Sequence, residues 1–134
     1  MHIAATITNS QQQNDLTVQT AGNKKSISIP AKPAGGGSSV NGGELLFLAL
    51  ATCFCNDIYR EAARMKINID SVSVTVDGEF GNEGEPATHI QYKTSVSSDA
   101  APDEIAALIK HVDATAEIHN TLRRGTKVTL VNAG

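Results

Sequence analysis

The two cysteines of the chain, Cys53 and Cys55, lie one residue apart in a segment, residues 41–65, that is predicted to form one long helix. Side chains two residues apart on a helix point about 200° away from each other, so these thiols cannot join in a disulfide while the helix holds. No second cysteine pair follows, and the four histidines are scattered, so the spacing predicts no zinc site or other metal site. No cofactor is predicted either.

The two thiols have different neighbours along the predicted helix. Steps of three, four and seven residues lead from Cys53 along a polar stripe and from Cys55 along an apolar one. The polar stripe is Asn56, Asp57, Arg60 and Arg64, and the apolar stripe is Ile58, Tyr59 and Ala62. A reactive thiol needs a nearby cation or donor to stabilise its thiolate, so Cys53 is the better candidate nucleophile. The alternative is that Cys53 is a small buried hydrophobe in a packed helix.

A second segment with concentrated chemistry is AEIHNTLRRG, residues 116–125. It combines an acid, a base, an amide and two cations: Glu117, His119, Asn120, Arg123 and Arg124. One interpretation is a solvated helix end, with arginines placed favourably near the negative end of the helix dipole. The other places His119 near the first helix as a general base or anion-binding partner. The remaining histidines, His2, His89 and His111, are interpreted as incidental.

The elements that must position these residues follow from the hydrophobic pattern. Apolar residues alternate with polar ones before residue 32, again in SVSVTVDG and HIQYKTSVSS, and once more at Val128 and Leu130. A period of two predicts half-buried strands. The predicted order is β-β-β-α-β-β-α-β, an α+β fold with a mostly antiparallel sheet around a long buried helix.

The boundaries of both helices have local signals. Asn41 is a suitable N-cap and Glu44 can complete a capping box, so the core helix is predicted over 44–65. Its first half, 45–51, is apolar on every face and is predicted to be buried on all sides. Pro102 suits the start of the second helix, and Gly125 is a plausible stop before the last strand.

Glycines concentrate in the stretch PAGGGSSVNGG between the first strands and the core helix. It lacks the spacing of a phosphate-binding loop and has no lysine entering the helix. We interpret residues 33–43 as a flexible linker. The functional alternative is a mobile lid near the start of the helix.

Length and net charge limit the number of domains and the kinds of binding partner. The 134 residues fit a single domain, 1–134, divided into N-terminal strands (1–32), the linker (33–43), the core helix (44–65) and the later strands and second helix (67–131). A formal net charge of −3 gives no electrostatic case for binding nucleic acid or an anionic membrane. The sequence shows no signal peptide and no apolar run long enough to span a bilayer, so we expect a cytoplasmic protein.

Taken together, the run NGGELLFLALATCF, the strands on either side of the helix and the AEIHNTLRRG segment resemble the OsmC/Ohr family. The names stand for osmotically inducible protein C and organic hydroperoxide resistance protein. The resemblance implies an α+β homodimer whose central helices are buried between intertwined sheets. Characterised members reduce organic hydroperoxides with a peroxidatic cysteine on this helix, a resolving cysteine in the later segment, and an Arg and a Glu that activate the first thiol.

The match to the family's catalytic positions is partial. Cys53 falls on the peroxidatic cysteine, whereas the resolving cysteine falls on Ala116. His119 and Asn120 fall on the family's Ser and Asn in the same motif. This chain therefore departs from the family at the second thiol.

The activating pair also departs from the family pattern. The Glu position falls on Gly43, with Glu44 one place away. No arginine precedes Arg60, so only a lysine could supply the charge there, and a lysine copies a bidentate arginine poorly. The lysines that could do so are Lys24, Lys25 and Lys32.

The resemblance implies two alternative functions. In the first, the protein is a thiol-dependent organic hydroperoxide reductase of one-Cys type, with Cys53 as nucleophile, His119, Asn120, Glu44 or a lysine in support, and an external thiol as reductant. In the second, it is a non-catalytic member that binds a small apolar molecule in the dimer-interface cavity, with Cys53 lining the pocket. Both imply a homodimer.

Overall fold

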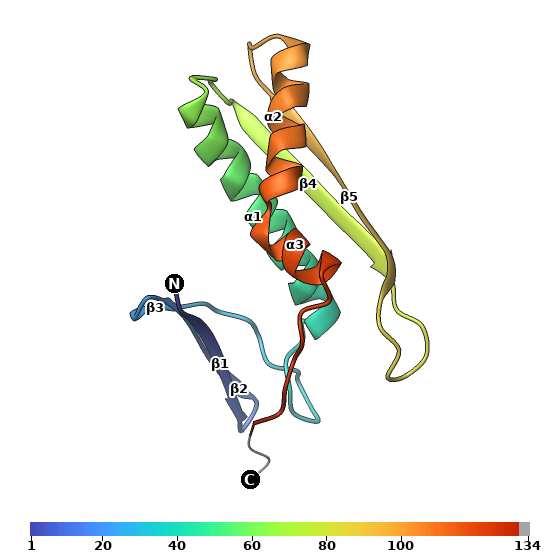
Figure 1. Cartoon of the computed structure of the whole chain (residues 1–134). Coiled ribbons are helices and arrows are strands. Elements are labelled where there is room, and N and C mark those ends of the chain that lie inside the picture. The colour runs from blue at the N-terminus through green and yellow to red at the C-terminus, as the bar shows by residue number, and fades with distance from the viewer. Residues whose placement is uncertain (132–134) are drawn as a thin grey trace. The chain divides into compact units, whose positions relative to one another are not determined.

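The computed structural model of the chain describes residues 1–131 and contains two compact units, Met1–Leu45 and Leu46–Gly134. The architecture is α+β with antiparallel sheets, as predicted (Figure 1). The elements in order are β1 (Ile3–Ser10), β2 (Gln13–Thr20), β3 (Asn23–Ser26), α1 (Gly42–Arg64), β4 (Ser71–Glu79), β5 (Thr88–Ser97), α2 (Pro102–Thr115) and α3 (Glu117–Arg123).

The N-terminal unit is built on a three-stranded antiparallel sheet in the order β1-β2-β3. The register pairs Ile7 with Leu16 on one face and Thr8 with Asp15 on the other. Because side chains alternate along a strand, one face of this sheet is apolar and the other carries hydroxyl groups. The alternation that predicted these strands is therefore confirmed, apart from the Ile27–Ile29 stretch, which lies just beyond the end of β3.

The glycine-rich segment folds back on the sheet. Gly35, Gly36 and Gly37 all have positive φ, a conformation that glycine adopts at little cost. The side-chain oxygen of Asn9 accepts a hydrogen bond of 2.9 Å from the backbone N–H of Gly37. An isolated bridge between Ala31 and Ser38 closes the turn. Residues 33–43 therefore include a turn that hydrogen-bonds to Asn9 of β1, and their flexibility stays a prediction.

Helix α1 starts with the predicted cap. The backbone N–H of Glu44 donates to Asn41 Oδ1 at 2.8 Å, and the backbone N–H of Asn41 donates to Glu44 Oε1 at 2.9 Å. This reciprocal pair is a capping box. The helix begins at Gly42, two residues earlier than the predicted range.

The second unit packs α1, α2 and α3 against the β4–β5 hairpin (Figure 1). Its core is formed by residues of α1, α2 and the position after α2, with apolar side chains of the hairpin packed against them. The core residues are Phe54, Ile58, Ala62, Leu108, Val112 and Ala116, and the hairpin adds Val72, Val74, Tyr92 and Val96. The alternation in β4 and β5 therefore turns one face of the hairpin toward the helices.

The first half of α1 differs from its prediction. Leu50 is buried, but Leu48 is 59 % exposed and Ala49 is also exposed. Within the second unit, α2, α3 and the hairpin thus cover only one side of this apolar run.

The C-terminal part departs from the sequence prediction in two respects. Backbone angles of −64° and 112° at Ala116 interrupt the expected second helix and separate α2 from α3. Residues 126–131 form no strand, and Val128 is 95 % exposed. A strand requires a hydrogen-bonding neighbour, and the described chain offers none to these residues. Within residues 1–131, no helix is long and apolar enough to cross a membrane.

Candidate functional site

Cys53 lies in the middle of α1, half-buried against the core of the second unit. Its thiol lies 3.9 Å from Oδ2 of Asp57, one helical turn further on. Asp57 is itself buried, and its other carboxylate oxygen pairs with the Arg60 guanidinium at 2.9 Å. The thiol thus faces a carboxylate whose charge is partly offset by an arginine on the far side.

This environment favours the neutral thiol. Burial raises the pKa of the Cys53 thiol, since the charged form loses solvation. The backbone N–H of Ile118 opposes the rise in pKa, the Asp57 carboxylate adds to it, and the N–H of Glu117 opposes it again. The net direction is upward, so only a small fraction of Cys53 is thiolate at neutral pH.

Cys55 lies in different surroundings, as the helical spacing predicted. It lines a shallow groove together with Ala51, Thr52, Asn56 and Val74. Both cysteines are free thiols. The second thiol is therefore not placed to react with Cys53.

The break between α2 and α3 brings Ala116 into the neighbourhood of Cys53. Ala116 is fully buried in the cluster against which Cys53 packs. The backbone N–H groups that act on the Cys53 thiol belong to the next two residues, Glu117 and Ile118. The segment that the sequence marked as chemically rich therefore does reach Cys53, but through its backbone.

His119 is buried, with 4 % of its surface exposed, whereas most residues of 117–125 are exposed, as the interpretation of a solvated helix end expected. Its ring centroid lies 4.7 Å from that of Tyr92 and 5.7 Å from that of Phe54. Burial lowers the pKa of His119, and the nearby Arg123 guanidinium lowers it further. The imidazole is thus neutral at pH 7, and neither ring nitrogen has a hydrogen-bond partner among the described residues.

Asn120 ties α3 to α2. Its side-chain N–H donates to the carbonyl of Ala114 at 3.1 Å, and its side-chain oxygen accepts from Arg123 at 3.2 Å. Both ends of the amide are engaged at the helix junction. A role for Asn120 in activating Cys53 has no contact to support it in the described chain.

Asp113 is the centre of a clamp that joins three elements. It accepts a hydrogen bond from the Tyr92 hydroxyl on β5 and one of 2.7 Å from Arg123 on α3. These two bonds lower the pKa of Asp113. Burial and the Asp113 hydrogen bond raise the pKa of Tyr92, which keeps the phenol protonated as a donor. The clamp fixes α3, which is too short to be stable alone.

The remaining predicted residues lie in the N-terminal unit. Glu44 is engaged in the capping box of α1. Lys24 and Lys25 are exposed residues of β3. Their participation in chemistry at Cys53 stays a prediction.

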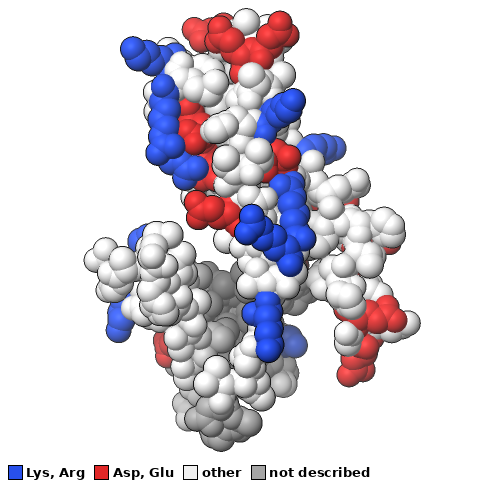
Figure 2. Space-filling view, in the orientation of Figure 1, with Lys and Arg blue, Asp and Glu red and all other residues white. Residues whose placement is uncertain are grey.

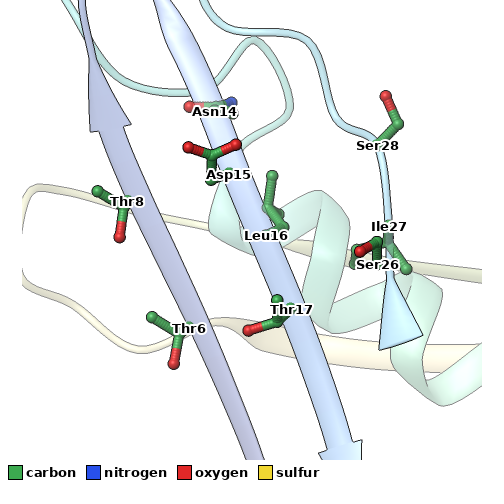
Figure 3. A pocket seen from close by; sticks show the side chains of 9 residues that line it. All are labelled: Thr6, Thr8, Asn14, Asp15, Leu16, Thr17, Ser26, Ile27 and Ser28. Carbon is green, nitrogen blue, oxygen red and sulfur yellow. The ribbon is translucent and has the colours of Figure 1, made fainter. Parts of the chain in front are cut away.

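Two hollows are candidates for ligand binding, one in each unit. The first lies on the hydroxyl face of the N-terminal sheet, where side chains of β1, β2 and the chain after β3 surround it (Figure 3). The second, of about 240 Å³, lies in the second unit between α1, β5 and α3 and is lined by Leu50, Ile90, Tyr92, His119, Leu122 and Arg123. Among residues 1–131, no three potential metal ligands cluster.

Charge on the second unit is mixed, with acidic and basic side chains interleaved on the face shown in Figure 2. Asp57, which the four-residue spacing placed on the polar stripe of Cys53, is indeed the neighbour of the thiol. Two residues that shape the site, Tyr92 and Asp113 in the clamp, were not predicted. Tyr92 and Asp113 are 21 residues apart in the chain, and no sequence signal joins them.

The described chain is thus α+β, with a half-buried thiol midway along its longest helix. The chain belongs to the OsmC family, since the sequence profile described as OsmC-like protein matches residues 35–131. A search among curated proteins finds no relative.

Solved structures share the fold at low sequence identity. An OsmC-like protein from Mycoplasma pneumoniae has a TM-score of 0.63 and 21 % identity, covering 93 % of this chain and 87 % of its own. An organic hydroperoxide resistance protein OsmC from Legionella pneumophila has a TM-score of 0.60 and 17 % identity, covering 92 % and 90 %. OhrB of Bacillus subtilis, an organic hydroperoxide resistance protein, has a TM-score of 0.55 and 18 % identity, covering 94 % and 93 %.

Proposed function

We propose that this OsmC-family protein is an organic hydroperoxide reductase of one-Cys type with Cys53 as its nucleophile. The observation that carries the proposal is the placement of Cys53: a half-buried helical thiol next to Ala116 and the two backbone amides that follow it. Two of the structural neighbours are named organic hydroperoxide resistance proteins. Because Ala116 is no thiol and Cys55 faces elsewhere, the resolving thiol must come from outside the chain.

The cycle balances with two external thiols. The Cys53 thiolate attacks the distal oxygen of the hydroperoxide, the O–O bond breaks, and the alkoxide leaves with both electrons and takes up the proton lost by the thiol. The products are an alcohol and the sulfenic acid of Cys53. One external thiol then releases water and forms a mixed disulfide, and a second external thiol restores Cys53 and departs as a disulfide.

The raised pKa of Cys53 makes this reductase slow at neutral pH. Each unit by which the pKa exceeds the pH reduces the thiolate about tenfold, so we expect the rate to rise about tenfold per pH unit from about pH 7 to 9. The test is consumption of cumene hydroperoxide in the presence of dithiothreitol. The Cys53→Ser variant should lose the activity and the matched Cys55→Ser variant should keep it.

A gain-of-function variant sharpens the same test. Ala116→Cys places a thiol at the position of the family's resolving cysteine, in the cluster that Cys53 contacts. We expect hydroperoxide to convert this variant to an intramolecular disulfide, seen as the loss of both thiols with no gain in mass from dithiothreitol. Equal turnover of cumene hydroperoxide by wild type and by Cys53→Ser would contradict the proposal that Cys53 is the nucleophile.

We further propose that the protein works as a homodimer in the cytoplasm, without nucleic acid or membrane partners. The support is the apolar surface that each unit by itself leaves uncovered, in the first half of α1, on the sheet of the N-terminal unit and at Val128 and Leu130. A second copy could cover these residues, and residues 126–131 could then find a strand neighbour. A reducing compartment would keep both thiols free.

The alternative function is a non-catalytic member that binds a small molecule in the dimer-interface cavity. The raised pKa of Cys53 favours it, because a protonated thiol is a poor nucleophile. Hydroperoxide turnover at a pH where Cys53 is thiolate separates the two functions, and the rate of iodoacetamide alkylation in Cys55→Ser shows where that pH lies. Rapid alkylation of Cys53 without hydroperoxide turnover at the same pH would favour the binding protein.

A further inference from the structure

The carboxylate of Asp57 links the Cys53 thiol to the guanidinium of Arg60 along one face of α1. The thiol donates a long hydrogen bond of 3.9 Å to Asp57 Oδ2. The Arg60 guanidinium binds the other carboxylate oxygen, Oδ1, at 2.9 Å. An arginine in contact with the sulfur would stabilise the thiolate, whereas here the group that faces the sulfur is the carboxylate. The order of the three side chains therefore favours a thiol that keeps its proton.

The Asp57 carboxylate acts on the thiol with little screening by water. Only 6 % of the surface of Asp57 is exposed, and charges interact more strongly where water is excluded. Arg60 offsets this charge only in part, because its guanidinium also lies 3.9 Å from Glu61 Oε1 and its side chain is 42 % exposed. Negative charge therefore remains uncompensated on the side of Asp57 that faces the sulfur.

Helix α3 approaches the Cys53 thiol with groups of both signs. Burial is the largest cause of the raised pKa of Cys53, and the backbone N–H of Ile118 opposes it. The Asp57 carboxylate comes next and raises this pKa further, ahead of the opposing N–H of Glu117 and the weaker effect of the Glu117 carboxylate. Among the side-chain charges that act on the thiol, Asp57 therefore has the strongest effect.

The other titratable groups near this site are neutral or bonded to each other. His119 of α3 lies close enough to Asp57 for their charges to interact, but burial lowers its pKa and leaves the ring neutral at pH 7. Tyr92 of β5 and Arg123 of α3 both donate to Asp113 of α2. These groups therefore supply no countercharge to the carboxylate that faces the thiol.

We infer that Asp57 is a positioning residue that holds the proton on the Cys53 thiol, and that Arg60 limits how strongly it does so. A carboxylate next to the sulfur disfavours a second negative charge there, and the hydrogen bond that the thiol donates is lost when the thiol ionises. The inference deepens the proposed function and rests on Cys53 being the nucleophile. In that reaction Asp57 slows the attack on hydroperoxide at neutral pH.

The test follows alkylation of Cys53 by iodoacetamide between about pH 6 and 11 in the full-length protein with Cys55→Ser. Asp57→Asn keeps the size and shape of the side chain and removes its charge. We expect the midpoint of the alkylation profile to fall by about one pH unit, because no carboxylate opposes the thiolate. Alkylation at pH 7 should rise about threefold, since about tenfold more thiolate is offset by the lower nucleophilicity of a less basic thiolate.

Two further variants separate charge from structure. Arg60→Gln should raise the midpoint, since Asp57 loses its countercharge, and this half-exposed position tests the inference even where Asp57→Asn fails to fold. The matched variant Arg64→Gln removes an arginine that pairs with Glu61, and should leave the midpoint unchanged. Asp57→Glu, which keeps the carboxylate, should stay closer to wild type than Asp57→Asn does.

Turnover of cumene hydroperoxide with dithiothreitol separates the inference from the proposed function. At pH 7, Asp57→Asn should turn over about threefold faster than the parent with Cys55→Ser alone. A lower alkylation midpoint without turnover in any variant would support the hold on the proton and contradict the proposed reductase. The inference is overturned by an unchanged or higher midpoint in Asp57→Asn, by equal midpoints in Arg60→Gln and Arg64→Gln, or by turnover that is present but does not rise in Asp57→Asn.

Discussion

The two units of the chain bury their apolar residues to different degrees. The fully buried apolar residues all belong to the second unit, where two antiparallel strands are covered by the chain's own helices. The N-terminal unit has the same strand alternation, yet Ile7 on its apolar face is 54 % exposed. A hydrophobic sheet face needs a covering layer for stability. The second unit therefore contains its own covering layer, whereas the N-terminal sheet, taken by itself, has no layer over its apolar face.

The same contrast runs along α1. Phe54, Ile58 and Ala62 in its second half are buried, whereas Leu48 in its first half is mostly exposed. The hydrophobicity of the two halves would suggest the reverse, since the first half is the more apolar. Burial along this helix thus depends on what packs against it, and the uncovered half is where we place the partner subunit.

The largest expected effect is at the centre of the covered region. Phe54→Ala should lower the free energy of unfolding by about 3–5 kcal/mol, because it removes a fully buried ring and leaves a cavity. The matched variant Phe80→Ala removes an exposed ring that contacts only Phe47 in a ring pair, and should cost about 1 kcal/mol. Denaturant unfolding measures both. Equal losses would mean that the second unit does not contain the dominant core.

The next effect tests whether the uncovered half of α1 meets a second copy. Leu48→Lys should raise the dimer dissociation constant about 10- to 100-fold, because a side chain that the partner would bury becomes charged. Ala107→Lys, on the exposed side of α2, should leave the dimer intact. Sedimentation velocity distinguishes the species. A monomeric wild type at micromolar concentration, or two variants that both remain dimeric, would contradict the proposed interface.

The smallest effect concerns the cap that starts α1. Asn41→Ala should cost about 1 kcal/mol, because it removes the acceptor for the N–H of Glu44 and opens the capping box. Asn41→Ser should recover most of the loss, since serine is an equally good N-cap. Thermal unfolding of the three proteins measures this. No difference between wild type and Asn41→Ala would show that the helix start is held by other contacts.

Local patterns predicted the elements well. Alternation located β1, β2, β4 and β5, and the Asn41–Glu44 pair marked the start of α1. These succeed because strand faces and helix caps depend on residues a few positions apart. The class of fold and the family were also correctly predicted from the sequence.

The errors concern contacts between distant parts of the chain. The second helix was not expected to break at Ala116, where the Asp113 clamp to Tyr92 and Arg123 holds α3 in place. The last strand was expected from Val128 and Leu130, but a strand needs a neighbour that hydrophobic alternation does not specify. For His119 both a solvated helix end and a place near the first helix were considered, and the ring is buried because it packs against Phe54 and Tyr92 from other elements.

The candidate site was likewise predicted only in part from the sequence. Helical geometry separated Cys53 from Cys55 and selected Cys53, and the sequence placed Ala116 where the family has its second thiol. The protonation state of Cys53 could not be predicted, since it depends on burial and on backbone groups of Glu117 and Ile118 that reach it through the fold. The neutral, unpaired state of His119 likewise depends on burial.

The sequence by itself predicted the order of elements as far as α2, the start of α1 to within two residues and the opposite directions of its two thiols, because each depends on the spacing of residues along one backbone. Only the tertiary structure decided which half of α1 is covered, how Asp57 and the α3 backbone affect Cys53, and that the His119 ring is buried. Solvation and hydrogen bonding are properties of the groups that surround a side chain. In this protein those groups come from several separate elements.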